Sequence, residues 1–283
     1  MISIDPVFLG LATLGMANFV MLNKISKEHR KKRHLVAKLT RITLFPVKSM
    51  RGVDVKEAEC TYTGLRAGGF RDRCFMVTDS KYDFVSARKI SKMSTIVAHV
   101  KDGQIHLSAE GSEPISVPLL VKLDQRIIPV LVWMEELEAV DCGDEVAGWL
   151  SKVLQRDGLR LVYHAEHMRK RRCDVAFQDG LPFMLLSEES LVDLNARLKK
   201  PVSMNNFRPN LVVEGCDAFD EDVWDKIYIG DVEFFNIKPC QRYRPLPKDA
   251  PQYWVDNPLF GINLTAVKPG VVHVGDPVFV TRK

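Results

Sequence analysis

Several signatures that would settle a function at once are missing from this chain of 283 residues. It has no G-x-G-x-x-G, Walker A, H-E-x-x-H or G-x-S-x-G motif, so the usual nucleotide-binding, zinc-protease and α/β-hydrolase interpretations lose their main support. Its six cysteines form no C-x-x-C pair and follow no regular spacing, which argues against a secreted disulfide scaffold or a zinc ribbon. We therefore expect the fold to face a reducing compartment.

The composition, 46% hydrophobic and 27% charged, is enough to bury one large core or two smaller ones. The formal net charge of +4 is unevenly distributed. Residues 1–41 carry eight Lys or Arg against Asp5 and Glu28, a net +6, which leaves −2 for the other 242 residues. The basic character belongs to the N-terminus, so we expect no nucleic acid partner for the folded part.

The apolar run at 7–22 is the special feature of this N-terminus, because it holds sixteen residues without a charge. As a helix it would rise about 24 Å, short of a bilayer core of about 30 Å. Six Lys or Arg follow at 24–33 and only Asp5 precedes it, so the positive-inside rule favours a membrane anchor with the C-terminal side in the cytosol. Two alternatives stay open. A cleaved secretory signal would carry its positive charge before the apolar run, and a core helix would show a polar face.

The rest of the chain predicts an α+β protein that is mainly β, without internal repeats. Two helices are expected at 144–156 and 187–199, the second with Ser187 as its N-cap. Strands bounded by turn residues are expected at 37–45, 52–60, 73–79, 104–109, 210–214, 227–237 and 271–281, the last with a turn at Gly275-Asp276. We divide the chain into an anchor with its basic flank (1–36) and two domains, 37–160 and 161–283.

Short polar clusters stand at the ends of the expected strands, where functional sites are often built. They are Phe45-Pro46-Val47-Lys48-Ser49, Arg71-Asp72-Arg73, Asn206-Phe207-Arg208-Pro209-Asn210 and Pro239-Cys240-Gln241-Arg242. In these clusters and in five longer stretches, the chain resembles the MOSC-domain family and most of all its mitochondrial amidoxime-reducing components. The stretches occur in the order EAECTYTGLRAGGFRDRCFMV, LSEESLVDLNARL, IGDVEFF, NPLFG and VGDPVFV, and the resemblance covers residues 38–283.

The resemblance implies a β-rich MOSC N-terminal domain and a β-barrel-like MOSC domain behind one transmembrane anchor. Such proteins lie on the cytosolic side of the mitochondrial outer membrane. They bind a pterin that carries molybdenum and a phosphate, and reduce N-hydroxylated compounds with electrons from a cytochrome b5-type haem protein and its flavin reductase. By similarity, five residues would bind this cofactor: Lys48, Ser49, Arg73, Arg208 and Arg242.

These residue types suit a phosphate, because lysine supplies a point charge, serine a hydroxyl and arginine a planar fork. Each also has an ordinary alternative. Lys48 after a proline turn would be solvated, and Arg73 beside Asp72 would form a surface ion pair of little energetic value. The three separate segments together favour an anion pocket.

The resemblance also implies a metal ligand, the second cysteine of a C-x-R-C loop, and here this chain departs from the pattern. The loop reads Cys240-Gln241-Arg242-Tyr243, so a tyrosine occupies the ligand position. A neutral phenol is a poor ligand for a soft metal. Cys240 is then the candidate ligand, although three residues span up to about 10 Å of chain, and its alternative role is packing behind Pro239.

Two further departures from the family pattern affect positions that would contact the cofactor. Gly180-Leu181 stands where the relatives carry a hydroxyl pair, and Asn263 replaces a common aromatic hydroxyl. Three hypotheses follow: a molybdenum-dependent N-reductive oxidoreductase, a degenerate MOSC binding module without catalysis, and sulfur handling through Cys240. The last is the weakest, because no second cysteine lies nearby in the sequence to resolve a persulfide.

Overall fold

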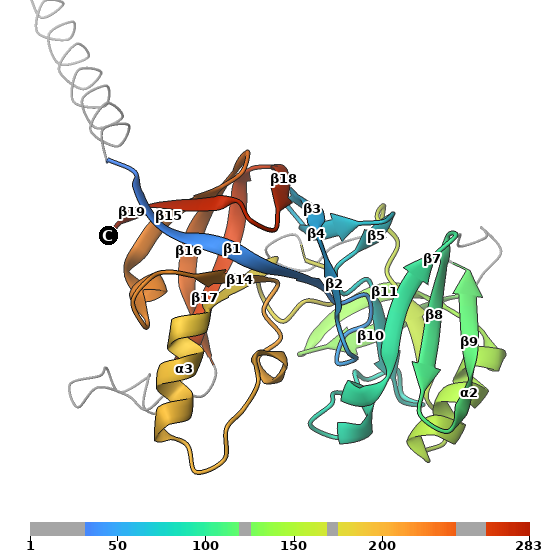
Figure 1. Cartoon of the computed structure of the whole chain (residues 1–283). Helices are drawn as coiled ribbons and strands as arrows, with labels where there is room; N and C mark the ends of the chain where they lie inside the picture. The colour runs from blue at the N-terminus through green and yellow to red at the C-terminus, as the bar shows by residue number, and fades with distance from the viewer. Residues whose placement is uncertain (1–31, 119–125, 169–174, 242–258) are drawn as a thin grey trace, which may run out of the picture. The chain divides into compact units, whose positions relative to one another are not determined.

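The computed structural model describes residues 32–118, 126–168, 175–241 and 259–283 (Figure 1). They form a mainly β fold with two α-helices, α2 (Asp144–Leu154) and α3 (Glu188–Arg197), and 3-10 turns at Ser91–Thr95, Met204–Asn206 and Asp220–Val223. The predicted anchor at 7–22 lies outside the described residues. Within the described part of the chain, no helix is both long enough and apolar enough to cross a bilayer.

The strands fall into two groups along the chain. The first group is β1 (His34–Leu44), β2 (Val53–Val55), β3 (Glu57–Thr61), β4 (Gly64–Ala67), β5 (Phe70–Arg71), β6 (Phe75–Thr78), β7 (Val97–Lys101), β8 (Gln104–Ala109), β9 (Ser112–Pro118), β10 (Ile127–Val132), β11 (Glu135–Asp141) and β12 (Arg160–Tyr163). The second group is β13 (Phe183–Ser187), β14 (Leu211–Glu214), β15 (Trp224–Ile229), β16 (Val232–Gln241), β17 (Leu259–Lys268), β18 (Gly270–His273) and β19 (Pro277–Arg282).

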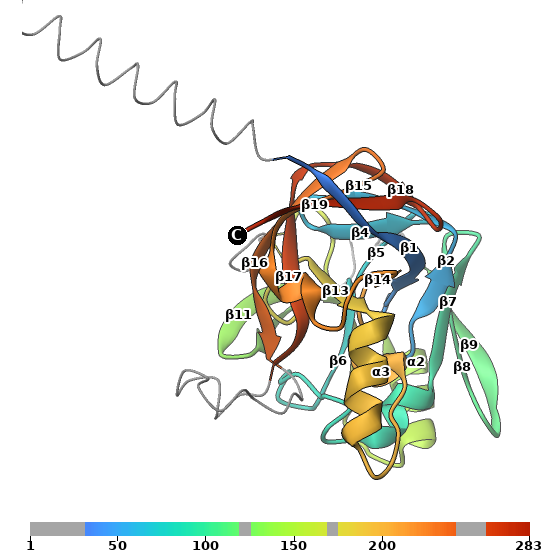
Figure 2. The same ribbon diagram turned by 60° about the vertical axis from the view of Figure 1, so that its left-hand side comes forward.

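The largest sheet closes on itself. Its order is β14-β13-β17-β16-β15-β19-β1-β2, and β14 also pairs with β1, so seven strands form a ring with β2 attached to β1 (Figure 2). Ile42 on β1 lies opposite Leu211 on β14. Three smaller sheets complete the described fold, in the orders β10-β11-β12-β6, β18-β3-β4-β5 and β7-β8-β9.

The buried side chains follow from these strands. All five residues of β13 are buried, as expected for a strand that has neighbours on both sides and cover on both faces. Helix α3 places Leu191 and Leu194 in one cluster with Met184 and Phe260. Its first turn is capped by Ser187, whose hydroxyl accepts the Ser190 N–H at 3.1 Å, and the predicted N-cap is confirmed.

Most predicted elements are present with shifted ends, including both helices. The strand predicted at 227–237 is wrong as a single element, because a turn at Gly230-Asp231 divides it into the hairpin β15–β16. Gly230 has φ 54°, and a Cβ there would lie 2.7 Å from the Val271 carbonyl oxygen, so this turn requires glycine. The stretch predicted at 52–60 is likewise two strands, β2 and β3. The turn at Gly275-Asp276 is present between β18 and β19.

Candidate functional site

Two of the polar clusters lie side by side through main-chain contacts. The Phe45 N–H donates to Asp72 Oδ1 at 2.9 Å, and the Arg73 N–H donates to the Phe45 carbonyl at 2.6 Å. Further along both segments, the Lys48 N–H donates to the Phe75 carbonyl at 2.8 Å. The loop after β1 is therefore fixed against the entry to β6.

Asn210 brings in the third cluster. Its Oδ1 accepts from Arg73 Nη1 at 3.3 Å and from the Met184 N–H at 3.2 Å, while Arg73 Nη2 donates to the Arg208 carbonyl at 3.2 Å. The guanidinium carbons of Arg73 and Arg208 lie 4.6 and 4.4 Å from the centre of the Phe45 ring. The fold thus brings together four of the predicted residues: Lys48, Ser49, Arg73 and Arg208.

Three of these four residues have left-handed backbone conformations. Ser49 has φ 71°, Arg73 φ 51° and Arg208 φ 59°, among nine described non-glycine residues with positive φ. Such a conformation costs on the order of 1–3 kcal/mol and persists only where the surrounding structure enforces it, often at functional sites. Three of the nine strained positions therefore lie where the sequence predicts the anion pocket.

Lys48, Asp72 and Arg73 carry charges that are buried in the protein, and Arg208 is partly buried. Arg73 pairs with Asp72, and the two side chains are 9% and 0% exposed, so the surface ion pair considered for Arg73 is not what forms. Arg208 donates to the Met50 carbonyl. Lys48 is 4% exposed, which overturns its alternative as a solvated lysine. Removing one partner from a buried pair such as Arg73–Asp72 costs about 3–5 kcal/mol, so these two groups are firmly positioned.

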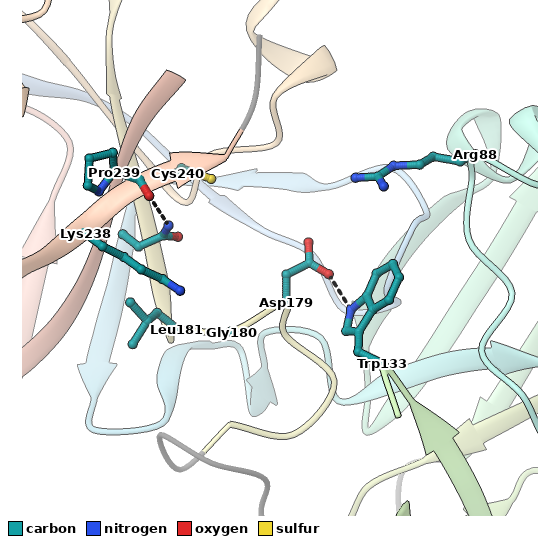
Figure 3. A pocket seen from close by; sticks show the side chains of 9 residues that line it. Arg88, Trp133, Asp179, Gly180, Leu181, Lys238, Pro239 and Cys240 are labelled. Carbon is teal, nitrogen blue, oxygen red and sulfur yellow. Dashed lines mark hydrogen bonds between the residues drawn. The ribbon is translucent and has the colours of Figure 1, made fainter. Parts of the chain in front are cut away.

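A pocket of about 270 Å³ is lined in part by Asp179, the ion-pair partner of Lys48 (Figure 3). The Lys48 ammonium donates to Asp179 Oδ1 at 2.5 Å, and the Trp133 indole N–H donates to the same oxygen at 3.1 Å. The described residues that line the pocket are Arg88, Trp133, Asp179, Gly180, Leu181, Lys238, Pro239, Cys240 and Asn263. It is therefore formed by the β10–β11 tip, the loop before β13, and strands β16 and β17.

Cys240 enters this pocket because β16 is irregular. Pairing with β17 shifts register between Pro239 and Gln241, as expected where a proline supplies no N–H to the ladder. The cysteine is 8% exposed, and its sulfur lies 3.8 Å from Met184 Sδ. Its thiol both packs against a core side chain and lines the pocket (Figure 3).

The comparisons with known proteins can now be set beside this geometry. The family model "MOSC N-terminal beta barrel domain" matches residues 36–157, and the model "MOSC domain" matches residues 173–279. The chain belongs to the MOSC-domain family. Mitochondrial amidoxime reducing component 2 of Rattus norvegicus is 33% identical over 96% of this chain and 93% of its own, and component 1 of Homo sapiens is 34% identical over 97% and 94%.

The departures that the sequence indicated lie on the pocket wall of this MOSC protein. Gly180, Leu181 and Asn263 all line it, and the Asn263 amide donates to the Pro239 carbonyl at 3.5 Å. A Cβ added at Gly180 would meet nothing within 4 Å, so the pocket has room for a side chain there.

Arg242 and Tyr243 lie outside the described residues, so the structure does not place them. Among the residues that it does describe, no group of three or more His, Cys, Asp or Glu is arranged to hold a metal ion. Cys240 is the one thiol among the described residues that line the pocket.

Trp133, Asp179 and Arg88 of this MOSC protein were missed by the sequence analysis. For Trp133 a signal existed: Trp133-Met134 connects two alternating stretches, 127–132 and 135–141, where a two-residue hairpin turn normally carries Asn-Gly or Asp-Gly. Nothing local singles out Asp179 or Arg88, whose proximity to the pocket depends on the folded chain.

Proposed function

We propose that this chain binds a molybdenum-bearing pterin cofactor and reduces N-hydroxylated compounds. The observation that carries the proposal is the meeting of Arg73 and Arg208 at Phe45, three residues before Lys48, whose partner Asp179 lines a pocket that also contains the Cys240 thiol. In the reaction the N–O bond breaks, two electrons and two protons are taken up, and an N–H product and water leave. A cytochrome b5-type haem protein and its flavin reductase would supply the electrons.

The described residues fit the anionic part of this cofactor. Arg73 and Arg208 lie over the Phe45 ring, and Lys48, three residues after Phe45, adds a third cation whose ammonium lies beside Asp179 and Trp133. Asp72 pairs with Arg73 and Asp179 pairs with Lys48, so a phosphate bound here would meet cationic side chains that carboxylates already hold in position. Arg242 would add a further cation from the loop after β16.

The residues also fit the soft metal in type, since Cys240 offers a thiol at the pocket. When bound, the cofactor supplies two-electron redox chemistry. The protein supplies the surroundings: Lys238 and Arg88 attract an anionic ligand, while Leu181 and Trp133 contribute apolar surface to the pocket lining.

A non-catalytic binding module is the second candidate. It is favoured by Tyr243 at the expected ligand position. It is also favoured by Gly180, Leu181 and Asn263 on the pocket wall, because these three residues offer neither a hydroxyl nor a thiol. In that case the anion pocket is retained and turnover is lost.

The test compares molybdenum content and N-reductive turnover of the purified full-length chain with those of two variants. If Cys240 is the ligand, the parent carries stoichiometric molybdenum and Cys240→Ser loses it. If the tyrosine has abolished ligation, the parent carries little metal, Cys240→Ser changes nothing and Tyr243→Cys gains metal. The control is Cys216→Ser: Cys216 is buried away from the pocket, and burial raises the pKa of its thiol to about 12. A parent without metal or turnover rejects the enzyme proposal.

We propose that the domains are divided as 37–160 and 161–283, close to the ranges 36–157 and 173–279 that the two family models match. We propose further that residues 7–22 anchor the protein in the mitochondrial outer membrane, with the bulk of the chain in the cytosol. The support is the charge asymmetry around the apolar run. Carbonate extraction of mitochondria should leave the protein in the membrane pellet, and added protease should digest its domain. Release into the supernatant, or full protection from protease, contradicts the anchor.

A further inference from the structure

Two hairpins of this chain use the same turn with very different residues. The β7–β8 hairpin has Asp102 and Gly103 at its tip, with φ 52° and 70°, and the β10–β11 hairpin has Trp133 and Met134, with φ 50° and 71°. Two successive residues with positive φ define the type I′ turn, which favours Asn or Asp followed by Gly. The chain therefore uses the preferred pair at one tip and a strained pair at the tip that reaches the pocket.

The strained tip holds its indole in a fixed position. The Trp133 N–H donates to Asp179 Oδ1 at 3.1 Å, and the ring meets the Phe84 ring edge-on, with centroids 5.4 Å apart. The Lys48 ammonium lies 5.7 Å from the indole centre. Trp133 nevertheless remains 47% exposed and lines the pocket, so part of its surface is available to a ligand.

The other residues that line the pocket suit a ligand that is both flat and acidic. Leu181 and Pro239 are apolar, while the cationic side chains of Arg88 and Lys238 reach toward the pocket (Figure 3). The volume of about 270 Å³ lies just below the range of about 300–1,000 Å³ typical of drug-sized ligands, so a single-ring compound fits the space best.

We propose that Trp133 is a substrate-contacting residue, and that the pocket selects a single-ring aromatic N-hydroxy compound that carries a carboxylate. The ring stacks on the indole, and the carboxylate pairs with Arg88 or Lys238. This inference rests on the proposed function for the N-hydroxy group, whereas binding of the acidic ring stands on the pocket alone.

The test measures binding to the purified full-length chain by quenching of tryptophan fluorescence and by calorimetry. The probes are 4-carboxybenzamidoxime, benzamidoxime without the carboxylate, and acetamidoxime without the ring. The main variant combines Trp133→Asn with Met134→Gly, which installs a preferred type I′ tip and so keeps the hairpin folded. Trp133→Phe is the milder second variant. Two controls leave the pocket intact: Met134→Ala, where the side chain is 91% exposed, and Trp149→Phe on α2.

We expect the double variant to bind 4-carboxybenzamidoxime about 3- to 10-fold more weakly, the loss of one aromatic contact. Arg88→Ala or Lys238→Ala should weaken the same probe about 2- to 5-fold and leave benzamidoxime unchanged. The control variants should bind like the parent. Acetamidoxime should bind least.

Equal affinity in the double variant and the parent overturns the inference, as does a parent that fails to bind the acidic ring or binds acetamidoxime equally well. Because binding and metal content are measured separately, the two proposals fail in different ways. If the protein is loaded with metal and active, but its affinity for the acidic ring is the same with and without Trp133, only this inference is refuted. A metal-free protein that binds the ring through Trp133 refutes only the proposed reaction.

Discussion

Replacing Met134 by glycine should stabilise the protein, because the residue is strained and makes few contacts. Its φ is 71° and its side chain is 91% exposed. The left-handed conformation costs a non-glycine residue roughly 1–2 kcal/mol, and Met134→Gly removes this cost. Glycine is also more flexible in the unfolded chain, which lowers the gain in unfolding free energy by about 0.5–1 kcal/mol. A net gain of about 0.5–1 kcal/mol remains, which should raise Tm by roughly 1–4 °C.

Urea denaturation and calorimetry of Met134→Gly and the parent measure this gain directly. Met134→Ala is the matched control, because alanine keeps the Cβ and should not stabilise the tip. The reciprocal change is Gly103→Ala in the β7–β8 hairpin, where φ is 70° and an added Cβ meets nothing within 4 Å. Because no clash arises there, backbone strain alone should lower the free energy of unfolding by about 1 kcal/mol. If Gly103→Ala destabilises as expected and Met134→Gly gives no gain, the tip is unstrained and the reasoning fails.

Three further predictions concern buried and paired charges. Arg208→Ala should weaken cofactor binding about 10- to 150-fold, the value of one charged hydrogen bond of about 1.5–3 kcal/mol, and unchanged affinity in equilibrium binding would remove Arg208 from the site. Asp179→Asn should let inorganic phosphate bind up to about 5-fold more tightly near Lys48, as measured by calorimetry, since the Asp179 carboxylate is 57% exposed and an exposed carboxylate contributes about 0–1 kcal/mol to an ion pair; weaker binding would contradict this. Burial raises the pKa of the Glu221 carboxyl above its ordinary value. The free energy of unfolding should therefore fall as the pH rises from the ordinary pKa through the pKa in the folded protein. Glu221→Gln should abolish this fall, and an unchanged pH profile in the variant would disprove the assignment.

The sequence predicts well what is local in this fold. The Ser187 cap is found because its signal lies within one helical turn, and β8 is found because its apolar residues alternate within one hairpin. The strand predicted at 227–237 failed because Gly230 sits within a continuous β-like pattern, and only its proximity to Val271 shows why a turn is required. Contacts between distant segments leave no local pattern.

The same distinction applies to the site. Lys48, Ser49, Arg73 and Arg208 stand in recognisable segments, and the fold brings them together. The partner of Lys48 could not be predicted, because Asp179 lies 131 positions further along the chain and follows no repeating pattern. Nor could periodicity reveal that Cys240 lines a pocket, since a register shift in β16 sets its position.

The closed sheet makes the order of synthesis matter for folding. Strand β1 leaves the ribosome first among the described strands, yet its two neighbours in the ring, β14 and β19, are made far later. Apart from the three residues that pair with β2, its edges stay unpaired until then, and pairing over such sequence distances is slow. A fragment of residues 161–283 would lack β1 and leave the facing edges of β14 and β19 open. Such edges promote aggregation, so we expect the two halves to fold only as one chain or when produced together.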